Sequence, residues 1–272
     1  MILTQFNILK AYDMAGYTLA EFKTNSSRQW DHTDNPDIPI LFVTTKAPAM
    51  ELITDDGSVA TIYTVDANTD VDVESFAMTV ETETSYYRII YLGGVLDPAH
   101  VDGNYYYRIE QGSDTYITDV FARTTSASNI NKLLKIVVES SDVERGKKTR
   151  YTLNLTDFVF EGYFNVSEYK GVAPEKEEHA EEDDGVIDPY YTSGSVARKW
   201  IIDGNQYIWE FLLGVRILQM NGSVELTYKG VVYDASDFMA EIAESHGGAN
   251  LIDIEISIKP DNEVMRVVNT IN

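Results

Sequence analysis

The sequence contains no cysteine, and its 21 Lys and Arg residues are outnumbered by 44 Asp and Glu residues in a chain of 272. Without cysteine, the chain has no disulfide, no thiolate metal site and no cysteine nucleophile. The formal net charge of −23 opposes binding to nucleic acid, because contacts to phosphate depend on clustered Lys and Arg side chains. We therefore expect no specific nucleic-acid binding, and good solubility from self-repulsion.

Long apolar segments are also missing. No run approaches the roughly 20 residues that a membrane helix requires. Residues 1–10 lack the basic and apolar regions of a signal peptide. These absences predict a soluble chain that is made in the cytoplasm and has no membrane partner.

The sequence has few of the residues and motifs on which catalysis depends. It contains no G-x-S-x-G nucleophile elbow, no G-x-x-x-x-G-K phosphate loop and no G-x-G-x-x-G dinucleotide fingerprint after a strand. Its histidines show no pair at the spacing of metal ligands; they are His32, His100, His179 and His246. We therefore predict a non-enzymatic protein with no catalytic residue, no cofactor and no bound metal.

One acidic segment, Asp66–Asp72, imitates the start of a calcium-binding loop, with oxygen-bearing side chains at the first, third and fifth positions. The sixth position is Val71, where the sharp turn of an EF-hand loop needs glycine. The twelfth is Ala77, where a bidentate glutamate is needed. These departures favour an Asp-rich turn and leave cation binding as the alternative.

Sugar recognition is a second class of function that the composition allows. A glycosidase would need two carboxylates beside an aromatic-lined cleft, and no local motif among the 44 acids selects such a pair. A carbohydrate-binding or adhesive β-sandwich would instead stack tyrosines, or Trp30, Trp200 or Trp209, on sugar rings. The apolar neighbours of these tryptophans favour burial in the core, so sugar binding is the alternative function.

Tyrosine and phenylalanine are abundant, with 18 and 10 residues, and this balance favours strands. Residues 101–121 predict a β-hairpin around which the first half is organised, with its turn at 111–114. A preceding strand at 86–92 is expected to join this hairpin in a three-stranded meander.

Further strand-like segments separated by turns precede the hairpin, as in a β-sandwich; they are 38–43, 50–53, 59–65 and 76–80. Pro39 predicts that the first of them is an edge strand or begins at a bulge. Small polar residues at 122–130 indicate a linker. We therefore predict an antiparallel β-sandwich domain at residues 1–126.

The second half predicts an α+β domain at residues 127–272, in which two helices pack against an antiparallel sheet. Its strands are expected at 133–138, 150–156, 158–166 and 196–202, in a hairpin at 224–233, and at 252–258. The last strand is the clearest, because four isoleucines alternate there with polar residues.

The two helices are expected on either side of the hairpin. Apolar residues of 206–219 recur at helical spacing. Asp234 or Ser236 can cap a second helix that ends at Gly247. Before them, the acidic run 175–184 predicts an extended, solvated loop at 172–188, because like charges at this density oppose compaction. A metal-binding or docking arm is the alternative.

The hairpin also carries a family resemblance. Gly103–Ile109 followed by Tyr116–Phe121 resembles a G-x-Y-Y-x-x-I … Y-x-S-E-x-F hairpin of structural proteins in tailed phages that infect Bacteroidetes, particularly the crAss-like phages. The second half is similar in the order of its acidic insertion, strand, helix, hairpin and short helix.

This resemblance implies a virion structural protein of the neck or tail, namely a ring-forming adaptor between portal and tail that lines or surrounds the DNA conduit. Such proteins have no enzymatic activity. The implied partners are further copies of the chain in a closed ring, often twelve-fold, together with the portal and other neck and tail ring proteins. The implied location is the virion.

Overall fold

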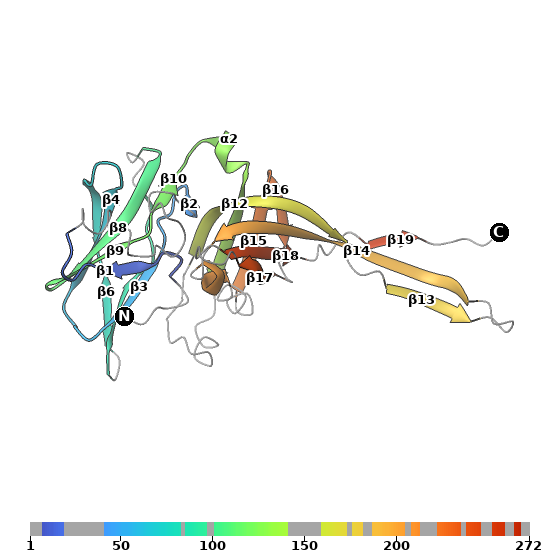
Figure 1. Ribbon diagram of the computed structural model, residues 1–272, viewed down its shortest axis with the longest axis horizontal. Coiled ribbons are helices and arrows are strands. Elements are labelled where there is room, and N and C mark those ends of the chain that lie inside the picture. Colours follow the sequence, from blue (N-terminus) through green and yellow to red (C-terminus); the bar gives the residue numbers. More distant parts are fainter. Residues whose placement is uncertain are drawn as a thin grey trace.

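The computed structural model is mainly β, so this part of the expected fold class is confirmed (Figure 1). The residues described are 7–18, 41–82, 85–96, 101–140, 159–172, 176–181, 187–204, 208–212, 222–234, 238–245, 252–258 and 264–267. Among them, no helix has the length and apolar character needed to cross a membrane.

The first half contributes strands to two sheets that face each other. Its elements are β1 (Ala11–Asp13), β2 (Leu41–Val43), β3 (Met50–Thr54), β4 (Ala60–Asp66), β5 (Asp72–Ala77), β6 (Thr79–Thr82), β7 (Tyr87–Tyr91), β8 (Gly103–Gln111), β9 (Asp114–Thr118) and β10 (Phe121–Arg123). β3, β7 and β6 form a three-stranded sheet, and the other strands belong to a larger one. The rings of Tyr91 on β7 and Tyr107 on β8 meet across the two layers, with centroids 5.9 Å apart.

Strand β8 is the centre of the larger sheet in this half. It pairs antiparallel with β9 around the predicted turn, so the predicted hairpin is confirmed. β4 also pairs along β8, and β10 pairs with its first residues. Tyr105, Tyr107 and Ile109 enter the main core, whereas Tyr106 enters a smaller cluster on the opposite face. The middle of β8 is therefore buried on both faces.

Two expectations for the strands around the hairpin are wrong. β7 does not extend the hairpin into a meander, because β4, β9 and β10 already occupy the edges of β8; β7 pairs with β3 and β6 instead. The expected strand 76–80 is divided at Met78, whose N–H donates to Ala60 O at 2.9 Å. β5, before Met78, lies in the larger sheet, and β6, after it, lies in the three-stranded sheet.

Strand β2 has neighbours on both sides, although Pro39 predicted an edge strand or a bulge. It pairs in parallel with β10, and its Phe42 lies opposite Tyr163 of the second half. The ladder begins at Leu41, and Pro39 lies outside the described residues. The edge prediction is therefore wrong, because the paired residues do not include the proline.

The second half adds two further layers. Its elements are α2 (Ala127–Ile130), β11 (Leu133–Ser140), β12 (Val159–Val172), β13 (Lys176–Glu181), β14 (Ile187–Gly204), β15 (Gly222–Tyr228), β16 (Val231–Asp234), β17 (Met239–Ser245), β18 (Ile252–Ile258) and β19 (Val264–Val267). β12 belongs to both layers, because it pairs first with β11 and then with β14. One layer continues from β11 through β15 to β16, and the other from β14 through β18 to β17.

Trp200 on β14 fills the space between these layers. It is fully buried, and its ring centroid lies 6.1 Å from that of Tyr228 and 5.5 Å from that of Tyr233. Ile254 and Ile256 enter the same core from β18, so the predicted alternation is confirmed there. The predicted hairpin is confirmed as β15 and β16, whereas the expected strand 150–156 lies outside the described residues.

Strand structure replaces one of the two expected helices. Residues 208–212 are helical, and the rest of the predicted helix lies mostly outside the described residues. The second expected helix is wrong, because β17 occupies most of that segment and pairs with β18. The helical spacing of Phe238 and Ile242 does not form one buried face, since Phe238 is buried and Ile242 is 43% exposed. The α+β description of this half is corrected to mainly β.

The acidic segment is also a strand, where a loop was expected at 172–188. β13 pairs antiparallel with the first part of β14, and residues 192–195 of β14 pair with β19. These strands, β13, residues 187–195 of β14 and β19, form a ribbon that we call the arm. It projects from the body of the molecule (Figure 1). Backbone pairing with β14 thus holds residues 176–181 of the acidic run extended.

The sheets are continuous across the expected boundary between residues 126 and 127. The helical turn α2 occupies part of the expected linker. Farther on, β2 meets β12, where a Cβ atom at Gly162 would collide with Phe160 Cζ and lie 2.9 Å from Leu41 Cδ1. Glycine therefore leaves room for these two buried side chains. One hydrophobic cluster contains buried residues from both halves, so the halves share a core.

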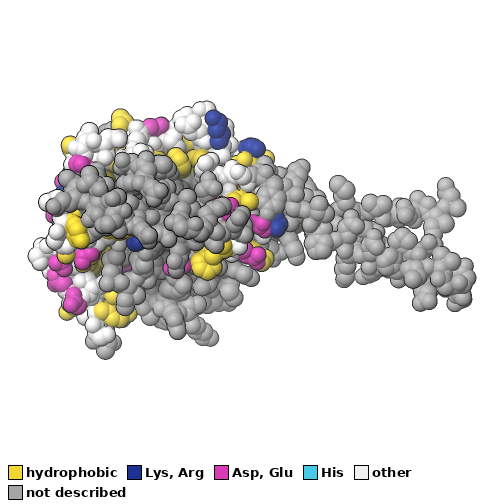
Figure 2. Space-filling model, viewed as in Figure 1, with side chains coloured by type: hydrophobic (Ala, Val, Ile, Leu, Met, Phe, Trp, Pro, Cys, Tyr) yellow, Lys and Arg dark blue, Asp and Glu magenta, His cyan; other side chains and the backbone are white. Residues whose placement is uncertain are grey.

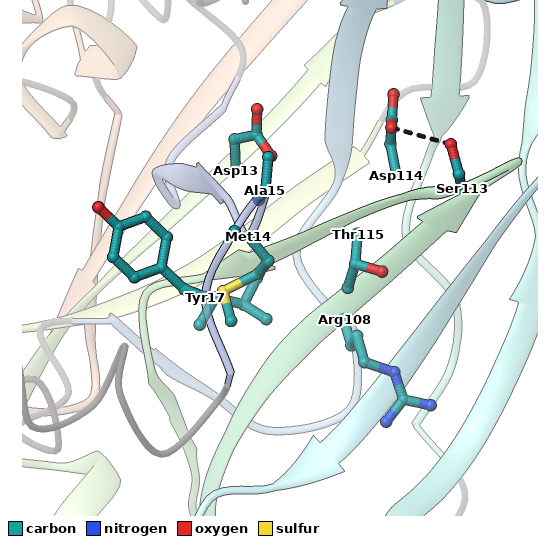
Figure 3. Close-up of a pocket in the computed structure, with 10 residues that line it drawn as sticks. Asp13, Met14, Ala15, Tyr17, Arg108, Ser113, Asp114 and Thr115 are labelled. Carbon is teal, nitrogen blue, oxygen red and sulfur yellow. Dashed lines mark hydrogen bonds between the residues drawn. The ribbon is translucent and has the colours of Figure 1, made fainter.

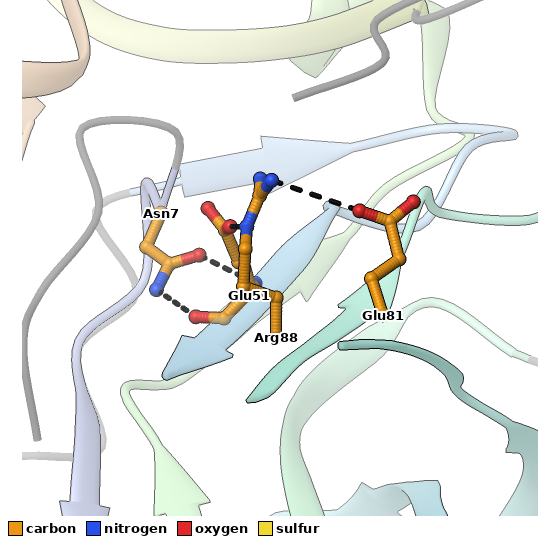
Figure 4. Close-up of polar contacts among 4 residues, drawn as sticks. All are labelled: Asn7, Glu51, Glu81 and Arg88. Carbon is orange, nitrogen blue, oxygen red and sulfur yellow. Dashed lines mark hydrogen bonds and ion pairs between the residues drawn. The ribbon is translucent and has the colours of Figure 1, made fainter. Parts of the chain in front are cut away.

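A polar contact ties the first described residues to β3 (Figure 4). The Asn7 side chain accepts a hydrogen bond from Glu51 N–H at 2.7 Å and donates one to Glu51 O at 2.6 Å. The backbone of a neighbouring strand would make the same two bonds to Glu51. The Glu51 carboxylate accepts from Arg88 Nε at 2.6 Å, and the Arg88 guanidinium lies 3.6 Å from Glu81. Because the Arg88 and Glu51 side chains are only 4% and 5% exposed, this is a buried ion pair.

We expect Arg88→Met to lower the free energy of unfolding by about 3–5 kcal/mol, because it leaves the Glu51 carboxylate buried without its cation. The double variant Glu51→Leu/Arg88→Met should lose much less, because no unpaired charge remains. Arg108→Met is the control, since its partly exposed ion pairs contribute about 1 kcal/mol or less. Urea unfolding followed by tryptophan fluorescence measures all three, and equal losses for the two single variants would contradict the expectation.

Candidate functional site

A pocket of about 330 Å³ opens beside the end of the β8–β9 hairpin (Figure 3). Its walls come from the end of β1 and the turn that follows, from the start of β9, and from Arg108 on β8. Met14 and Tyr17 lie on one side of it, and Asp114 and Thr115 lie on the other (Figure 3). All the residues that line it are described, so it can be analysed as a candidate binding site.

The turn Met14–Tyr17 shapes one wall of the pocket. Met14 N–H donates to Thr115 O at 2.9 Å and so extends the β1–β9 ladder by one bond. Tyr17 N–H then donates to Met14 O at 2.9 Å, and Gly16 has a φ of +79°, which favours glycine. This turn holds the Tyr17 side chain, 43% exposed, at the pocket wall.

The positive charge in the pocket wall is compensated by neighbouring acids. The Arg108 guanidinium lies 2.8 Å from Asp72 and 3.0 Å from Glu110, and it also covers the Tyr63 ring at 4.6 Å. Burial lowers the pKa of Arg108, but the hydrogen bonds and charges of its two acidic partners outweigh this and raise it. Arg108 therefore brings no unpaired charge to the pocket.

Carboxylates dominate the surface around this end of the sheet. Figure 2 shows acidic side chains along the margin of this face farthest from the arm, whereas most visible Lys and Arg side chains lie elsewhere. Burial raises the pKa of Tyr116 on β9, and four nearby carboxylates raise it further; they are Asp114, Asp13, Asp55 and Asp56. The charge around the pocket is therefore strongly negative.

The pocket rests on a second hydrophobic cluster, on the face of the sheet opposite the main core. Met14 and Ile117 belong to both the cluster and the pocket lining. The buried members of the cluster are Met14, Val65, Ala67, Tyr106, Ile117 and Val120, with Tyr12 and Tyr63 packed against it. Apolar support of this kind fixes the floor of the pocket, while the polar groups above it stay accessible.

The segment Asp66–Asp72 forms an Asp-rich turn, as its sequence favoured. The Asp66 carboxylate accepts from the N–H groups of Asn68 and Thr69 at 2.8 and 2.9 Å, and Asp70 accepts from the Tyr106 hydroxyl at 3.2 Å. Within the described residues, no group of three or more His, Asp or Glu is placed to hold a metal ion. The oxygens of this turn are thus engaged in hydrogen bonds and ion pairs of the fold.

The tryptophans do not form a sugar platform in the described part of the chain. Trp200 is fully buried, and Trp209 is partly buried against the main core, so the expected burial is confirmed for both. Trp30 lies outside the described residues. Of the histidines, His179 lies in β13 and the other three lie outside the described residues.

A polar cluster joins the two halves where β2 meets β12. Thr44 Oγ1 and the Tyr163 hydroxyl both donate to Glu161 Oε1, at 2.9 and 3.0 Å, and Lys135 Nζ lies 3.3 Å from Glu161 Oε2. Burial alone would raise the pKa of Glu161, but these hydrogen bonds and the Lys135 charge outweigh burial and lower it. The cluster therefore favours the ionised carboxylate and binds the halves together.

Two buried tyrosines between the sandwich layers differ in their hydrogen bonding. The Tyr107 hydroxyl donates to Pro48 O at 3.0 Å, whereas that of Tyr91 has no hydrogen-bond partner among the described residues. Burial raises the pKa of both phenols, and the nearby Glu74 charge adds to this. Both phenols are therefore neutral in the folded protein well above the usual tyrosine pKa of about 10.

The pocket residues were not singled out from the sequence as a site. The structure places Arg108 on the strand before the hairpin turn, as predicted, whereas Asp114, which the sequence places in the turn, begins β9. Asp13 and Tyr17 are distant from both in sequence, and β1–β9 pairing brings them together. The only local signal was the Ala15–Gly16 step, which is typical of a turn after a short strand.

We expect Tyr107→Phe to destabilise the protein by about 1–2 kcal/mol, because it leaves the Pro48 carbonyl without its buried donor. Tyr91→Phe, the matched control, should be neutral or slightly stabilising, because it removes a buried hydroxyl that makes no hydrogen bond to any described residue. Urea unfolding at pH 7 compares them. A larger loss for Tyr91→Phe would show that its hydroxyl does have a partner.

We expect the stability difference between the native chain and Glu161→Gln to shrink as the pH falls. The pKa of Glu161 is lowered on folding, so its contribution is complete above the unfolded-state value of about 4.3 and is lost as the pH falls through the folded-state value. Chemical denaturation between pH 7 and pH 3 measures the difference. The exposed Glu139→Gln is the control, and a Glu161→Gln difference that stays constant with pH would contradict the assignment.

Comparison with known proteins assigns no function to the pocket or the arm. No protein-family model, curated protein sequence or solved structure matches the chain. The function is therefore inferred from the pocket, the arm and the resemblance carried by the hairpin.

Proposed function

We propose that this protein is a non-enzymatic structural component of a tailed-phage virion, which assembles into a closed ring in the neck or tail between portal and tail. The ring surrounds the DNA conduit, and its partners are further copies of the chain, the portal and the neighbouring ring proteins. The observation that carries this proposal is the arm. The hairpin resemblance to crAss-like phage structural proteins supplies the setting.

The arm is a thin ribbon built by extending body strands outward. Residues 198–204 of β14 pair with β18 inside the body, whereas residues 187–193 pair with β13 beyond it (Figure 1). A narrow ribbon has little core of its own and is marginally stable alone in water. An arm of this kind gains stability by packing on a neighbouring molecule, as subunits in closed rings do through heterologous contacts.

The charge of the chain is compatible with a conduit wall. A net charge of −23 per chain makes any ring of copies strongly negative, which discourages adhesion of the passing DNA. The same charge opposes assembly of the copies at low ionic strength. Ring closure must therefore rely on short-range contacts, such as backbone pairing along the strands of the arm.

Carbohydrate binding is the less favoured function. The described tryptophans, Trp200 and Trp209, pack in the core and leave no indole platform on the described surface. Tyr17 in the pocket is an exposed aromatic ring of the kind that such a module would use. A glycan array with the intact chain tests this function directly.

Shortening the arm tests the proposed function. Val172 and Val196 face each other in the β12–β14 ladder, so residues 173–195 can be replaced by an Asn-Gly turn that keeps this pairing. We expect the full chain to form closed rings, alone or with portal and tail proteins, and the shortened chain to remain monomeric. Native mass spectrometry and negative-stain imaging measure both.

The unfolding midpoint of the body is the control, and it should be nearly the same in the two proteins. Higher salt should favour rings of the full chain by screening self-repulsion. Identical rings from the shortened chain would remove the arm from the assembly. A full chain that stays monomeric in the presence of portal and tail proteins would refute the proposed function.

A further inference from the structure

We propose that the pocket beside the β8–β9 hairpin is a docking site for a cationic side chain, Arg or Lys, of a basic partner protein. The pocket, about 330 Å³, is large enough for one such side chain and too small for a folded segment. The argument rests on the groups that line it and on the charge around it.

The lining offers the groups that bind a guanidinium or an ammonium ion. The ring of Tyr17 is 43% exposed and can accept a cation over its face. Asp13 and Asp114 supply carboxylates. Within the described residues, one oxygen of each is occupied: Asp13 Oδ1 accepts from the N–H of Ala15 at 2.8 Å, and Asp114 Oδ1 accepts from the Ser113 hydroxyl at 3.4 Å (Figure 3). Within the described residues, neither carboxylate belongs to an ion pair, so both can accept charge-assisted hydrogen bonds.

The cation already in the wall does not satisfy these carboxylates. Arg108 is bound to Asp72 and Glu110 and covers Tyr63, and Figure 3 shows its guanidinium directed away from Asp13 and Asp114. The pocket therefore combines an aromatic wall, an apolar floor and two unneutralised acids. Anionic ligands are disfavoured by the same charges.

The surrounding charge selects a basic protein over a second copy of this chain. Each copy carries −23, so two copies repel at distances up to about 10 Å at moderate salt, whereas a basic partner is attracted and oriented. Within the proposed function, this partner is a neighbouring ring or tail protein. The identity of the partner rests on that proposed function, but the chemistry of the pocket does not.

N-acetyl-arginine methylamide, titrated into the full ¹⁵N-labelled chain, tests the pocket, with the uncharged citrulline analogue as the matched probe. We expect saturable shifts of the Ala15, Gly16 and Thr115 amide signals with the arginine probe, and at least tenfold weaker binding of the citrulline probe. Asp13→Asn and Asp114→Asn should each weaken the arginine probe at least threefold, whereas Glu241→Gln, a change of an exposed acid on β17, should not.

The proposal would be overturned if the two probes bound equally. It would also be overturned if the arginine probe shifted the amide signals near all exposed acids. Shifts of the same amides by oligosaccharides but not by the arginine probe would assign the pocket to sugar. The arm deletion separates this result from the proposed function, since the pocket residues lie outside the deleted segment. Rings without arginine binding refute only the docking site, and arginine binding without rings refutes only the ring.

Discussion

Burial on both faces of β8 is the constraint on which the N-terminal half depends. The face with Tyr105, Tyr107 and Ile109 needs a second layer, and β3, β7 and β6 provide it. The face with Tyr106 carries a smaller cluster, to which β4, β9 and Met14 in the turn after β1 contribute. Met14 and Ile117 of this cluster also line the pocket. The candidate binding site thus lies at the smaller of the two clusters that bury the central strand.

Charge is distributed unevenly between the interior and the surface. Inside, carboxylates are compensated at short range, as in the Glu51–Arg88 pair between β3 and β7 and the Glu161 cluster between the halves. On the surface, acidic residues lie close together at the end of the β8–β9 hairpin. The sequence places a further acidic run in the arm. Interior pairs hold the fold together, and the uncompensated exterior determines which partners are attracted.

The two halves and the arm form one connected set of strands. β2 and β12 join the halves, and β12 and β14 run from the body toward the arm. Continuous backbone ladders therefore connect the arm to the body. This continuity is compatible with the proposed structural role.

Local patterns in the sequence determined the strands whose signals are strong and self-contained. The hairpin at 101–121 and the alternating isoleucines at 252–258 follow from turn chemistry and period-two burial, which need few distant residues. Tertiary structure decided the partners of each strand. β7 joined the smaller sheet because the edges of β8 were filled, and β17 became a strand because β18 offered it an edge. The pocket depends on β1–β9 pairing between residues about 100 positions apart, which no local pattern encodes.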